Sequence, residues 1–229
     1  MEAIILAGGM GTRLREVVSD VPKPMAPVSG KPFLYFILEW LSKFPVNKII
    51  LSVGFQSQKI VDFFGDSFTN IPIEYVIEEK PLGTGGAIKF ALQNTTGNDV
   101  LVLNGDTYFP IDLNNLYSFH YGNQNLFSVA LKRMKDFSRY GSVEQQGNTI
   151  LRFNEKKFVH DGLINGGIYF INKKFFKSGE LPEVFSLESD ILAKEAQYSV
   201  LKCMEFDDMF LDIGVPEDYY RAEDMIKKS

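Results

Sequence analysis

Short apolar runs alternate with amphipathic segments along the first half of the chain. Each run is rich in Val, Ile and Leu and has the length of one buried strand, and the runs cover residues 3–7, 48–53, 73–77 and 99–103. Between them, apolar side chains recur at helical spacing, which predicts helices over residues 34–41, 58–64 and 84–93. This alternation is typical of an α/β fold with a doubly wound, mostly parallel sheet, whose ligand crevice lies at the carboxyl ends of the strands.

The pattern changes in the second half. Short strand candidates follow one another with little helix between them, at residues 127–132, 142–144, 149–153 and 164–171. Residues 187–196 and 217–227 are predicted to be helical. We interpret the strands as a β-rich extension that builds a second wall of the crevice. No linker or repeat marks a boundary, so we expect a single domain over residues 1–229, with halves at about 1–112 and 113–229.

Composition narrows the classes of partner. The chain has 229 residues, of which 45% are hydrophobic, and a net charge of −5. No run of Lys and Arg supplies a basic stripe, so a nucleic-acid partner is not expected. No apolar stretch reaches the roughly 20 residues of a membrane span, and no basic region precedes the first strand, so we expect a cytosolic location without membrane contact. We expect a monomer or a small homo-oligomer.

Cysteine and histidine chemistry is not expected. The single cysteine, Cys203, cannot form an internal disulfide and lies in a strand-like segment, so we expect it in the core. One cysteine with His120 and His160 leaves no zinc site of the usual ligands. Neither histidine has the context of a Ser-His-Asp triad, and we expect both to be solvated.

A glycine-rich turn follows the first predicted strand. It contains, in order, Gly8, Gly9, Gly11, Thr12 and Arg13. Glycines let the backbone bend tightly and bring its N–H groups close to phosphate oxygens, and Arg13 adds a fork of donors for the same oxygens. Lys23, between Pro22 and Pro24 in what we expect to be extended backbone, adds a compact second cation. These residues predict a polyphosphate site.

Two better-known phosphate motifs do not fit this turn. A P-loop requires Lys-Ser or Lys-Thr after its last glycine, and neither follows here. The dinucleotide motif Gly-x-Gly-x-x-Gly fails because Leu14 stands where the third glycine would be. A tight strand-to-helix turn without a ligand is the alternative interpretation.

A carboxylate follows the strand predicted over residues 99–103. Asp106, in Asn104-Gly105-Asp106, lies where a parallel sheet is expected to bind its ligand. Magnesium prefers one or two carboxylates together with substrate phosphates, so we expect Asp106 to hold Mg²⁺. A simple Asn-Gly-Asp turn is the alternative.

The Gly-x-Gly-Thr-Arg turn, followed by Pro22-Lys23-Pro24, resembles the signature of the sugar-phosphate nucleotidyltransferases. These enzymes join a nucleoside triphosphate to a sugar 1-phosphate and release pyrophosphate. The resemblance covers nearly the whole chain and implies a Rossmann-like nucleotidyltransferase fold, with Arg13 and Lys23 as catalytic cations. It implies a nucleotide site in the first half, formed by Leu6, Gly8, Gly9, Gly11, Thr12, Arg13, Lys23, Glu78, Gly83 and Asp106.

The resemblance extends through the second half, where the sugar phosphate is implied to bind. Residues 210–219 are similar to the family segment aromatic-x-Asp-x-Gly-x-Pro-Glu-Asp-Tyr, which implies that Asp212 is the second magnesium ligand. Val215 stands where many members carry Thr. Three further family elements, Tyr-Gly-x-Val, Glu-Lys-Pro and Asn-Gly-Gly, imply sugar-phosphate contacts at Gly141, Glu155, Lys156 and Asn165. Lys157 replaces the usual proline of the second element.

Charge dictates the mechanism we expect. The attacking group is a phosphate oxygen of the sugar 1-phosphate, which needs no protein base because its second pKa lies near ~6. Repulsion between two polyanions is the main obstacle, and positioning plus cations should overcome it. Mg²⁺ on Asp106 and Asp212 would bridge the reacting phosphates. Arg13 would hold the departing pyrophosphate, and Lys23 would neutralise the α-phosphate or the attacking group.

The choice of base rests on residues 78–86. Family members that use uracil or thymine often carry Gln where Glu78 falls, whereas guanine presents two adjacent donors that a carboxylate accepts. Glu78 therefore favours GTP. Glu79 is the alternative residue for base recognition, because one sequence does not determine which of the two neighbouring glutamates faces the base.

Within the family, the chain is most similar to the D-glycero-α-D-manno-heptose 1-phosphate guanylyltransferases. The shared elements are Pro-Leu-Gly-Thr-Gly-Gly-Ala-Ile, Asn-Gly-Asp-Thr, Leu-Ile-Asn-Gly-Gly-Ile-Tyr and Asp-Ile-Gly-Val-Pro-Glu-Asp-Tyr-Tyr. This likeness implies synthesis of GDP-heptose for surface polysaccharides.

Three alternative functions were considered, of which the first stays open. The first is the same reaction on mannose, glucose or hexosamine 1-phosphate with GTP, UTP or dTTP. A glycosyltransferase would lack the Gly-x-Gly-Thr-Arg turn, because it holds only a diphosphate. A noncatalytic nucleotide sensor is disfavoured because Arg13, Lys23 and both aspartates are retained.

Overall fold

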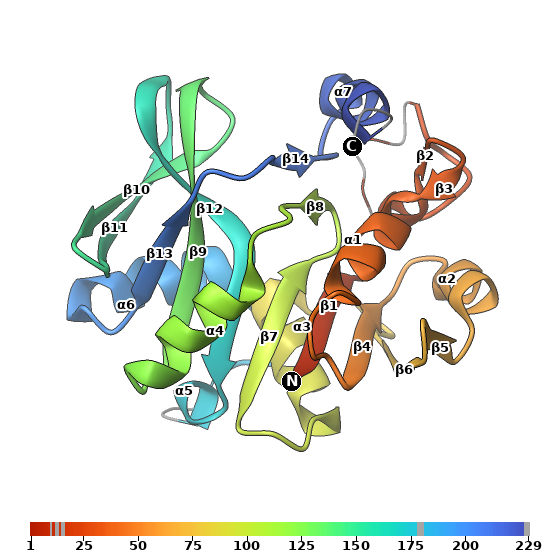
Figure 1. Cartoon of the computed structure of the whole chain (residues 1–229), viewed down its shortest axis with the longest axis horizontal. Helices are drawn as coiled ribbons and strands as arrows, with labels where there is room; N and C mark the ends of the chain where they lie inside the picture. The colour runs from red at the N-terminus through yellow and green to blue at the C-terminus, as the bar shows by residue number, and fades with distance from the viewer. Residues whose placement is uncertain (10, 12–13, 15–16, 178–180, 227–229) are drawn as a thin grey trace.

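One sheet of ten strands runs through the molecule in the order β10-β11-β13-β9-β12-β7-β1-β4-β6-β5 (Figure 1). The computed structural model describes residues 1–9, 11, 14, 17–177 and 181–226. Within them, the strands of this sheet are β1 (Glu2–Ala7), β4 (Lys48–Val53), β5 (Ser67–Phe68), β6 (Ile71–Ile77), β7 (Asp99–Asn104), β9 (Phe127–Phe137), β10 (Gly141–Gln146), β11 (Thr149–Lys156), β12 (Val159–Asn172) and β13 (Lys202–Phe206). Two small sheets pair β2 (Pro27–Val28) with β3 (Lys31–Pro32), and β8 (Thr107–Tyr108) with β14 (Leu211–Asp212).

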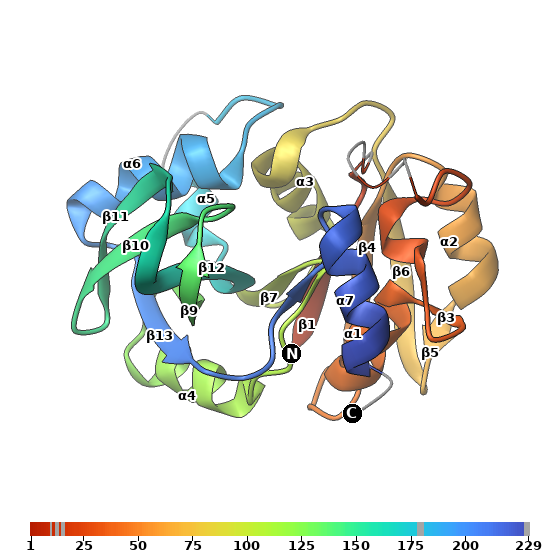
Figure 2. The same ribbon diagram turned by 90° about the horizontal axis from the view of Figure 1, so that it is seen from above.

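Helices cover both faces of the large sheet. They are α1 (Phe33–Leu41), α2 (Ser57–Phe64), α3 (Gly83–Ala91), α4 (Leu113–Gly122), α5 (Lys174–Lys177), α6 (Ala193–Glu195) and α7 (Pro216–Ile226). Shorter turns are η1 (Lys23–Met25), η2 (Leu92–Asn94), η3 (Leu187–Leu192) and η4 (Ala196–Tyr198). Figure 2 shows α1 and α4 on one face of the sheet, and α3 and α6 on the other. None of the helices in the described ranges has the length and apolar content needed to cross a bilayer.

The first half forms the parallel part of the sheet. Strand β1 lies in its centre, with β7 on one side and β4 and then β6 on the other, all parallel. The chain thus winds outward in both directions from β1, and the carboxyl ends of β1 and β7 diverge at the point where the strand order reverses. Such a switch point is where open α/β sheets bind ligands. The doubly wound α/β fold expected from the apolar pattern is confirmed.

Side chains of β1 alternate between two cores because successive residues of a strand face opposite sides. Ala3 and Ile5 pack under α1 and α4, whereas Ile4 packs on the face covered by α3. Both faces of β1 are therefore apolar, and β4 and β7 are buried in the same way. This explains why these three strands were predicted from apolar runs.

The second half extends the sheet with mainly antiparallel strands. The long strand β12 joins the two parts, since it pairs with β7 through Ile168–Asn172 and with β9 along most of its length. The strands predicted over residues 127–132 and 164–171 are longer in the structure, as β9 and β12. Most of the additional residues are half-exposed or exposed, and the buried Phe137 and Leu163 among them are too isolated to form an apolar pattern.

The helices of the structure differ from the predicted helices at two places. Helix α4 was not predicted, because its buried positions are Leu113, Leu116 and the polar His120, so its apolar pattern is weak. Asp112 caps it by accepting the N–H of Asn114 at 2.9 Å. The helix predicted over residues 187–196 is instead a π-helical turn, η3, followed by the single turn of α6.

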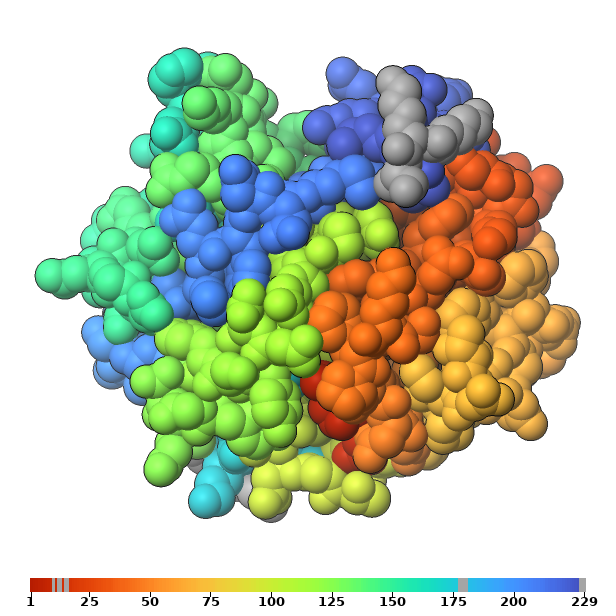
Figure 3. All heavy atoms as spheres, viewed as in Figure 1, coloured from red at the N-terminus to blue at the C-terminus, as the bar shows by residue number. Residues whose placement is uncertain are grey.

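The C-terminal helix α7 returns to the first half of the chain. The hydroxyl of Tyr219 donates to the carbonyl of Pro27 at 2.5 Å, and the N–H of Ser29 donates to Glu223 Oε1 at 2.9 Å. In the space-filling view, α7 rests on the orange surface of the N-terminal segments (Figure 3). This contact sets the position of β14, which lies immediately before α7.

His120 is buried, so the expectation that both histidines are solvated is wrong for it. Its Nδ1 lies 2.8 Å from the Ser128 hydroxyl and its Nε2 3.2 Å from Asp99 Oδ1. The three residues form a Ser-His-Asp arrangement, but Ser128 is fully buried and His120 is only 1% exposed, so no substrate reaches them. Asn172 also donates to Asp99 at 2.6 Å, and the group ties α4 to the sheet. His160 is exposed, as expected.

Cys203 lies in the core, as expected. It is 1% exposed, and burial raises the pKa of its thiol to about 12. The thiolate that a nucleophile requires is therefore absent near neutral pH.

Burial makes folding stability depend on the protonation of His120. Desolvation lowers the pKa of this ring below its usual 6.5, although Asp99 opposes the shift. The unfolded chain therefore takes up a proton first, and the free energy of unfolding falls as the pH drops from 7.5 through and below 6.5, with a slope that approaches about 1.4 kcal/mol per pH unit only below 6.5. Urea unfolding of His120→Gln should show lower stability at pH 7.5 and a flatter pH dependence. His160→Gln, a change of the exposed ring, should keep the wild-type slope; equal slopes in all three proteins would contradict this assignment.

Candidate active site

A cavity of about 520 Å³ opens at the carboxyl ends of β1 and β7. Eight of the residues predicted to bind the nucleotide line it: Leu6, Gly8, Gly9, Gly11, Lys23, Glu78, Gly83 and Asp106. They come from β1, the glycine-rich segment after it, η1, the loop after β6, the start of α3 and the loop after β7. Thr12 and Arg13 lie outside the described residues. The sheet thus brings together segments that are up to 100 residues apart, at the switch point.

Glu78 forms one wall of this cavity and is held in place by two donors. The Ser52 hydroxyl donates to its Oε1 at 3.0 Å, and the N–H of Leu82 donates to its Oε2 at 3.2 Å. A Cβ on Gly8 would lie 2.5 Å from Oε1, so only glycine leaves room for the carboxylate. Glu79 is not among the residues that line this cavity, so between the two glutamates the geometry favours Glu78.

Gly11 and Lys23 are packed against each other. Gly11 has a φ of +56°, and a Cβ there would lie 2.7 Å from Cβ of Lys23. Both facts require glycine. The expectation of extended backbone at Lys23 is wrong: Pro22 is extended, but Met25 N–H donates to Pro22 C=O at 2.7 Å and closes a 3₁₀ turn that starts at Lys23. The turn points the Lys23 side chain inward, where it is 11% exposed.

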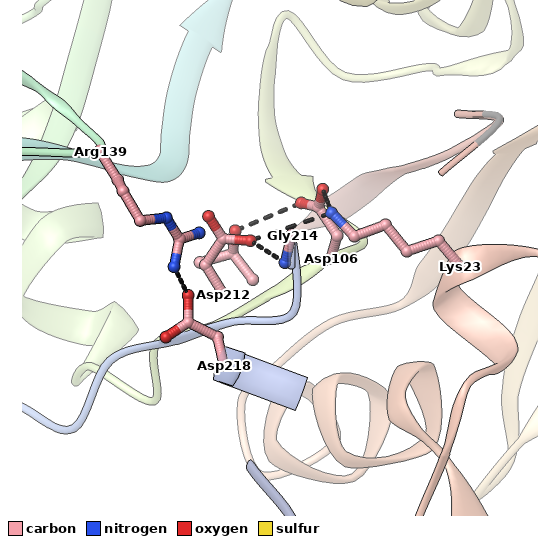
Figure 4. Close-up of polar contacts among 7 residues, drawn as sticks. Lys23, Asp106, Arg139, Asp212, Gly214 and Asp218 are labelled. Carbon is pink, nitrogen blue, oxygen red and sulfur yellow. Dashed lines mark hydrogen bonds and ion pairs between the residues drawn. The ribbon is translucent and has the colours of Figure 1, made fainter. Parts of the chain in front are cut away.

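Lys23 forms ion pairs with both predicted metal ligands. Its Nζ lies 2.5 Å from Asp106 Oδ2 and 3.9 Å from Asp212 Oδ1. The two aspartates are adjacent because β14 pairs with β8, which sets Asp212 opposite Thr107, and because Ile213 N–H donates to Asp106 C=O at 3.1 Å. Figure 4 shows the carboxylates between Lys23 on one side and Arg139 on the other.

The electrostatic balance of this cluster is unfavourable for Asp212. Burial raises the pKa of its carboxyl, and the charge of Asp106 raises it further. Lys23, the Gly214 N–H that donates to Oδ1 at 2.7 Å, and Arg139 oppose the shift. Arg139 is itself paired with Asp218. The five charged groups drawn in Figure 4 therefore carry one more negative than positive charge.

A divalent cation fits this donor set. Two carboxylates that repel each other at the edge of a cavity supply hard oxygen ligands, and one or two such ligands with substrate phosphates are what Mg²⁺ prefers. Within the ranges that the structure describes, no group of three or more His, Cys, Asp or Glu side chains could hold a metal without a substrate. Asp106 and Asp212 are the residues that would hold the ion.

The four residues predicted to contact the sugar phosphate lie outside the lining of this cavity. Gly141 pairs with Lys156 across β10 and β11, and Glu155 and Lys156 are exposed. A Cβ on Gly141 would lie 2.4 Å from the Asn154 carbonyl, so strand packing alone requires this glycine. Asn165, on β12, donates to the Tyr169 hydroxyl at 2.8 Å and accepts Gly167 N–H at 3.0 Å.

Four polar residues around the cavity were missed from the sequence. Thr84, Asn104 and Glu188 line it, and Ser52 orients Glu78. Thr84 and Asn104 stand inside motifs quoted above, where only the neighbouring glycine and aspartate received roles. Ser52 and Glu188 have no local signal, because a buried Ser in a strand and a Glu in a helical turn are both ordinary.

Lys23 occupies the position between the carboxylates that a divalent cation would share. We expect Lys23→Met to bind Mn²⁺ more tightly in the absence of nucleotide, by about tenfold, since a competing ammonium is removed. Electron paramagnetic resonance of free Mn²⁺ measures this affinity directly. Lys31→Met, a change of an exposed lysine near the same segment, should bind Mn²⁺ like the wild type. Unchanged or weaker binding by Lys23→Met would show that the ion does not use this carboxylate pair.

Comparison with known protein families matches residues 2–229 to the family described as nucleotidyl transferase. Two similar proteins are described as D-glycero-alpha-D-manno-heptose 1-phosphate guanylyltransferases. The one from Aneurinibacillus thermoaerophilus is 45% identical over 223 residues, which is 97% of this chain and 97% of that protein. The one from Campylobacter jejuni is 48% identical over 221 residues, 96% of this chain and 97% of that protein.

Solved structures agree in fold. The crystal structure of HddC from Yersinia pseudotuberculosis complexed with GMP-PN has a TM-score of 0.88 and 37% sequence identity, and the match covers 98% of this chain and 99% of HddC. The inositol-1-phosphate CTP transferase from T. maritima has a TM-score of 0.79 at 22% identity, over 100% of this chain and 96% of that one, and supports the fold alone.

Proposed function

This chain belongs to the nucleotidyl transferase family, and from that premise we propose that it transfers GMP from GTP to D-glycero-α-D-manno-heptose 1-phosphate. The products are GDP-heptose and pyrophosphate. The relatives that carry this activity in their names are 45% and 48% identical over almost the whole chain. The observation that supports the proposal most strongly is that Lys23 forms ion pairs with Asp106 and Asp212 beside the glycine-lined cavity.

The chemistry needs positioned charge rather than a protein base. A phosphate oxygen of the sugar 1-phosphate forms a bond to the α-phosphorus of GTP as the bond to the β-phosphate oxygen breaks. The attacking phosphate is already largely dianionic at pH 7. The chain therefore has to align two polyanions and offset their repulsion.

Each predicted residue keeps a defined part in this proposal. The backbone around Gly8, Gly9 and Gly11 faces the triphosphate, and Lys23 leaves its carboxylate partner to neutralise the reacting phosphates. Asp106 and Asp212 would hold Mg²⁺, which when bound would withdraw charge from phosphate oxygens. Arg13, outside the described residues, keeps its predicted role at the departing pyrophosphate.

The two halves of the chain divide the substrates. We assign the nucleotide to residues of about 1–112 and the sugar phosphate to about 113–229, within one domain. Gly141, Glu155, Lys156 and Asn165 retain their proposed contacts with the sugar phosphate. A cytosolic location and a monomer or small homo-oligomer complete the proposal.

Guanine selection is assigned to Glu78. A carboxylate has about four lone-pair positions, and Ser52 and Leu82 use two of them, so two remain for the adjacent N1–H and N2–H donors of guanine. The two donors also prevent the carboxylate from rotating. A hydrogen bond to a charged group contributes about 1.5–3 kcal/mol, enough to select between bases.

The decisive experiment is a pyrophosphate-release screen of GTP, ATP, UTP, CTP and dTTP against several sugar 1-phosphates with Mg²⁺. We expect GTP with the heptose 1-phosphate to give the highest kcat/KM. Asp212→Asn should lose on the order of 10²–10³ in rate while keeping its thermal unfolding midpoint. Faster turnover of UTP or dTTP than of GTP would overturn the guanine assignment, and near-normal rates in Asp212→Asn would remove that residue from the site.

Glu78→Gln tests base selection separately. The amide presents a donor where guanine also presents donors, so the GTP-to-UTP ratio of kcat/KM should fall about 10–100-fold. Glu79→Gln, an equally conservative change next to it, should leave the ratio unchanged. A loss confined to Glu79→Gln would transfer the role to that residue.

A further inference from the structure

An ion pair lies beside the predicted metal ligands, on the side away from Lys23 (Figure 4). Arg139, in the turn between β9 and β10, donates from its Nη1 to Oδ2 of Asp218, which is in the first turn of α7. The two side chains are 35% and 17% exposed. The pair thus connects the β-rich part of the sheet to the helix that follows Asp212. Neither residue has a role in the reaction proposed above.

The guanidinium of Arg139 is restrained from a second side. Its Cζ lies over the ring of Tyr140, 5.6 Å from the ring centre. Tyr140 in turn packs edge-on against Phe210, with the ring centres 5.9 Å apart. A planar guanidinium stacks on such a ring while its N–H groups donate within its own plane. Stacking and the bond to Asp218 together give Arg139 one preferred orientation.

Asp212 is close to the same guanidinium but is not its partner. Burial lowers the pKa of Arg139, but the hydrogen bond to Asp218 and the charges of Tyr140, Asp218 and Asp212 outweigh it and raise the pKa. Arg139, Asp212 and Asp218 all line one small cavity of about 60 Å³, which leaves the guanidinium space to turn between the two carboxylates. Within the described residues, its ion pair is nevertheless with Asp218.

Pairing with Asp212 instead would block the metal site. An arginine can bind a carboxylate through two parallel N–H bonds and so occupy both oxygens, whereas a divalent cation needs at least one of them. We propose that Asp218 sequesters Arg139 and thereby keeps Asp212 available to the divalent cation. Asp218 is then a positioning residue that acts through Arg139. This inference rests on the proposed function, which assigns the cation to Asp212.

The sequestered arginine still has a use at the site. Its charge is among the groups that oppose the rise in the pKa of Asp212, which burial and Asp106 cause. Arg139 therefore offsets part of the repulsion between the two aspartates from a distance, without taking up their oxygens. An unpaired arginine in the same place would give this benefit only at the expense of the cation.

Asp218→Asn is the informative variant, because it keeps the shape of the side chain and removes the charge that holds Arg139. We expect its affinity for Mn²⁺ in the absence of nucleotide to fall about tenfold, since the freed guanidinium pairs with Asp212. Electron paramagnetic resonance of free Mn²⁺ measures this. Glu217→Gln, which removes an exposed charge from the same helical turn, should bind Mn²⁺ like the wild type. Wild-type affinity in Asp218→Asn would overturn the proposal.

A second background separates sequestration from the charge of Asp218 itself. In Arg139→Gln there is no guanidinium to release, so adding Asp218→Asn should weaken Mn²⁺ binding by less than about threefold, and the two changes are then not additive. An equal loss in both backgrounds would show that Asp218 acts through its own charge and would overturn the proposal. Thermal unfolding identifies a variant that has lost its fold, and Asp218→Ser, which also removes the charge, then replaces Asp218→Asn in the same comparison.

The crystal structure of metal-free Asp218→Asn tests the movement directly. We expect the guanidinium of Arg139 at ion-pair distance from Asp212, and a guanidinium that stays away from Asp212 would overturn the proposal.

Asp212→Asn distinguishes a failure of the proposed metal site from a failure of this inference. If Asp212→Asn binds Mn²⁺ like the wild type, the cation does not use Asp212, and the metal assignment fails together with the inference. If Asp212→Asn binds Mn²⁺ more weakly while Asp218→Asn binds it normally, the metal assignment stands and only the sequestration is overturned.

Discussion

The site depends on two carboxylates being held close together around one ammonium group that is only 11% exposed. Asp106 and Asp212 repel each other, and burial adds to the cost of charging Asp212. Lys23 offsets part of this cost at 2.5 and 3.9 Å. The pairing of β8 with β14 and the packing of α7 on the first half keep the carboxylates in place. The fold thus maintains a cluster with excess negative charge. Such a cluster is suited to bind an additional cation, and phosphate together with that cation.

The rest of the cavity is organised by the sign of its hydrogen-bonding groups. Gly8, Gly9, Gly11 and Lys23 line the part of the cavity to which the phosphates are assigned. Oxygen-bearing side chains of Glu78, Asn104 and Glu188 line other parts of the cavity, and Glu78 is the one assigned to the base. Because carboxylates repel phosphate, Glu78 and Glu188 disfavour phosphate beside them and favour its placement near Lys23. Orientation of this kind is a large part of what a catalyst of phosphoryl transfer supplies.

Buried polar groups are where prediction from sequence was least successful. His120 is a polar residue on the apolar face of α4, and its partners Ser128 and Asp99 come from other strands, so no local pattern indicates the cluster. Helix α4 was missed for the same reason. Ser52 and Glu188 become significant only through contacts with residues that are 26 and 104 positions away. In contrast, the strands β1, β4 and β7 were predicted because burial on both faces requires nearly continuous apolar runs.

Local constraints could therefore be inferred without coordinates, and long-range contacts could not. The need for glycine at Gly8 and Gly11, the parallel strands and the carboxylate that follows β7 all obey rules of short range, since backbone geometry and burial act on neighbouring residues. The backbone at Lys23, the adjacency of Asp212 to Asp106 and the hold of Thr84 on Glu188 arise from segments that meet only after folding. Hydrogen bonds and ion pairs act over a few ångströms, so their partners are set by the packing of the sheet and helices, which one sequence does not display.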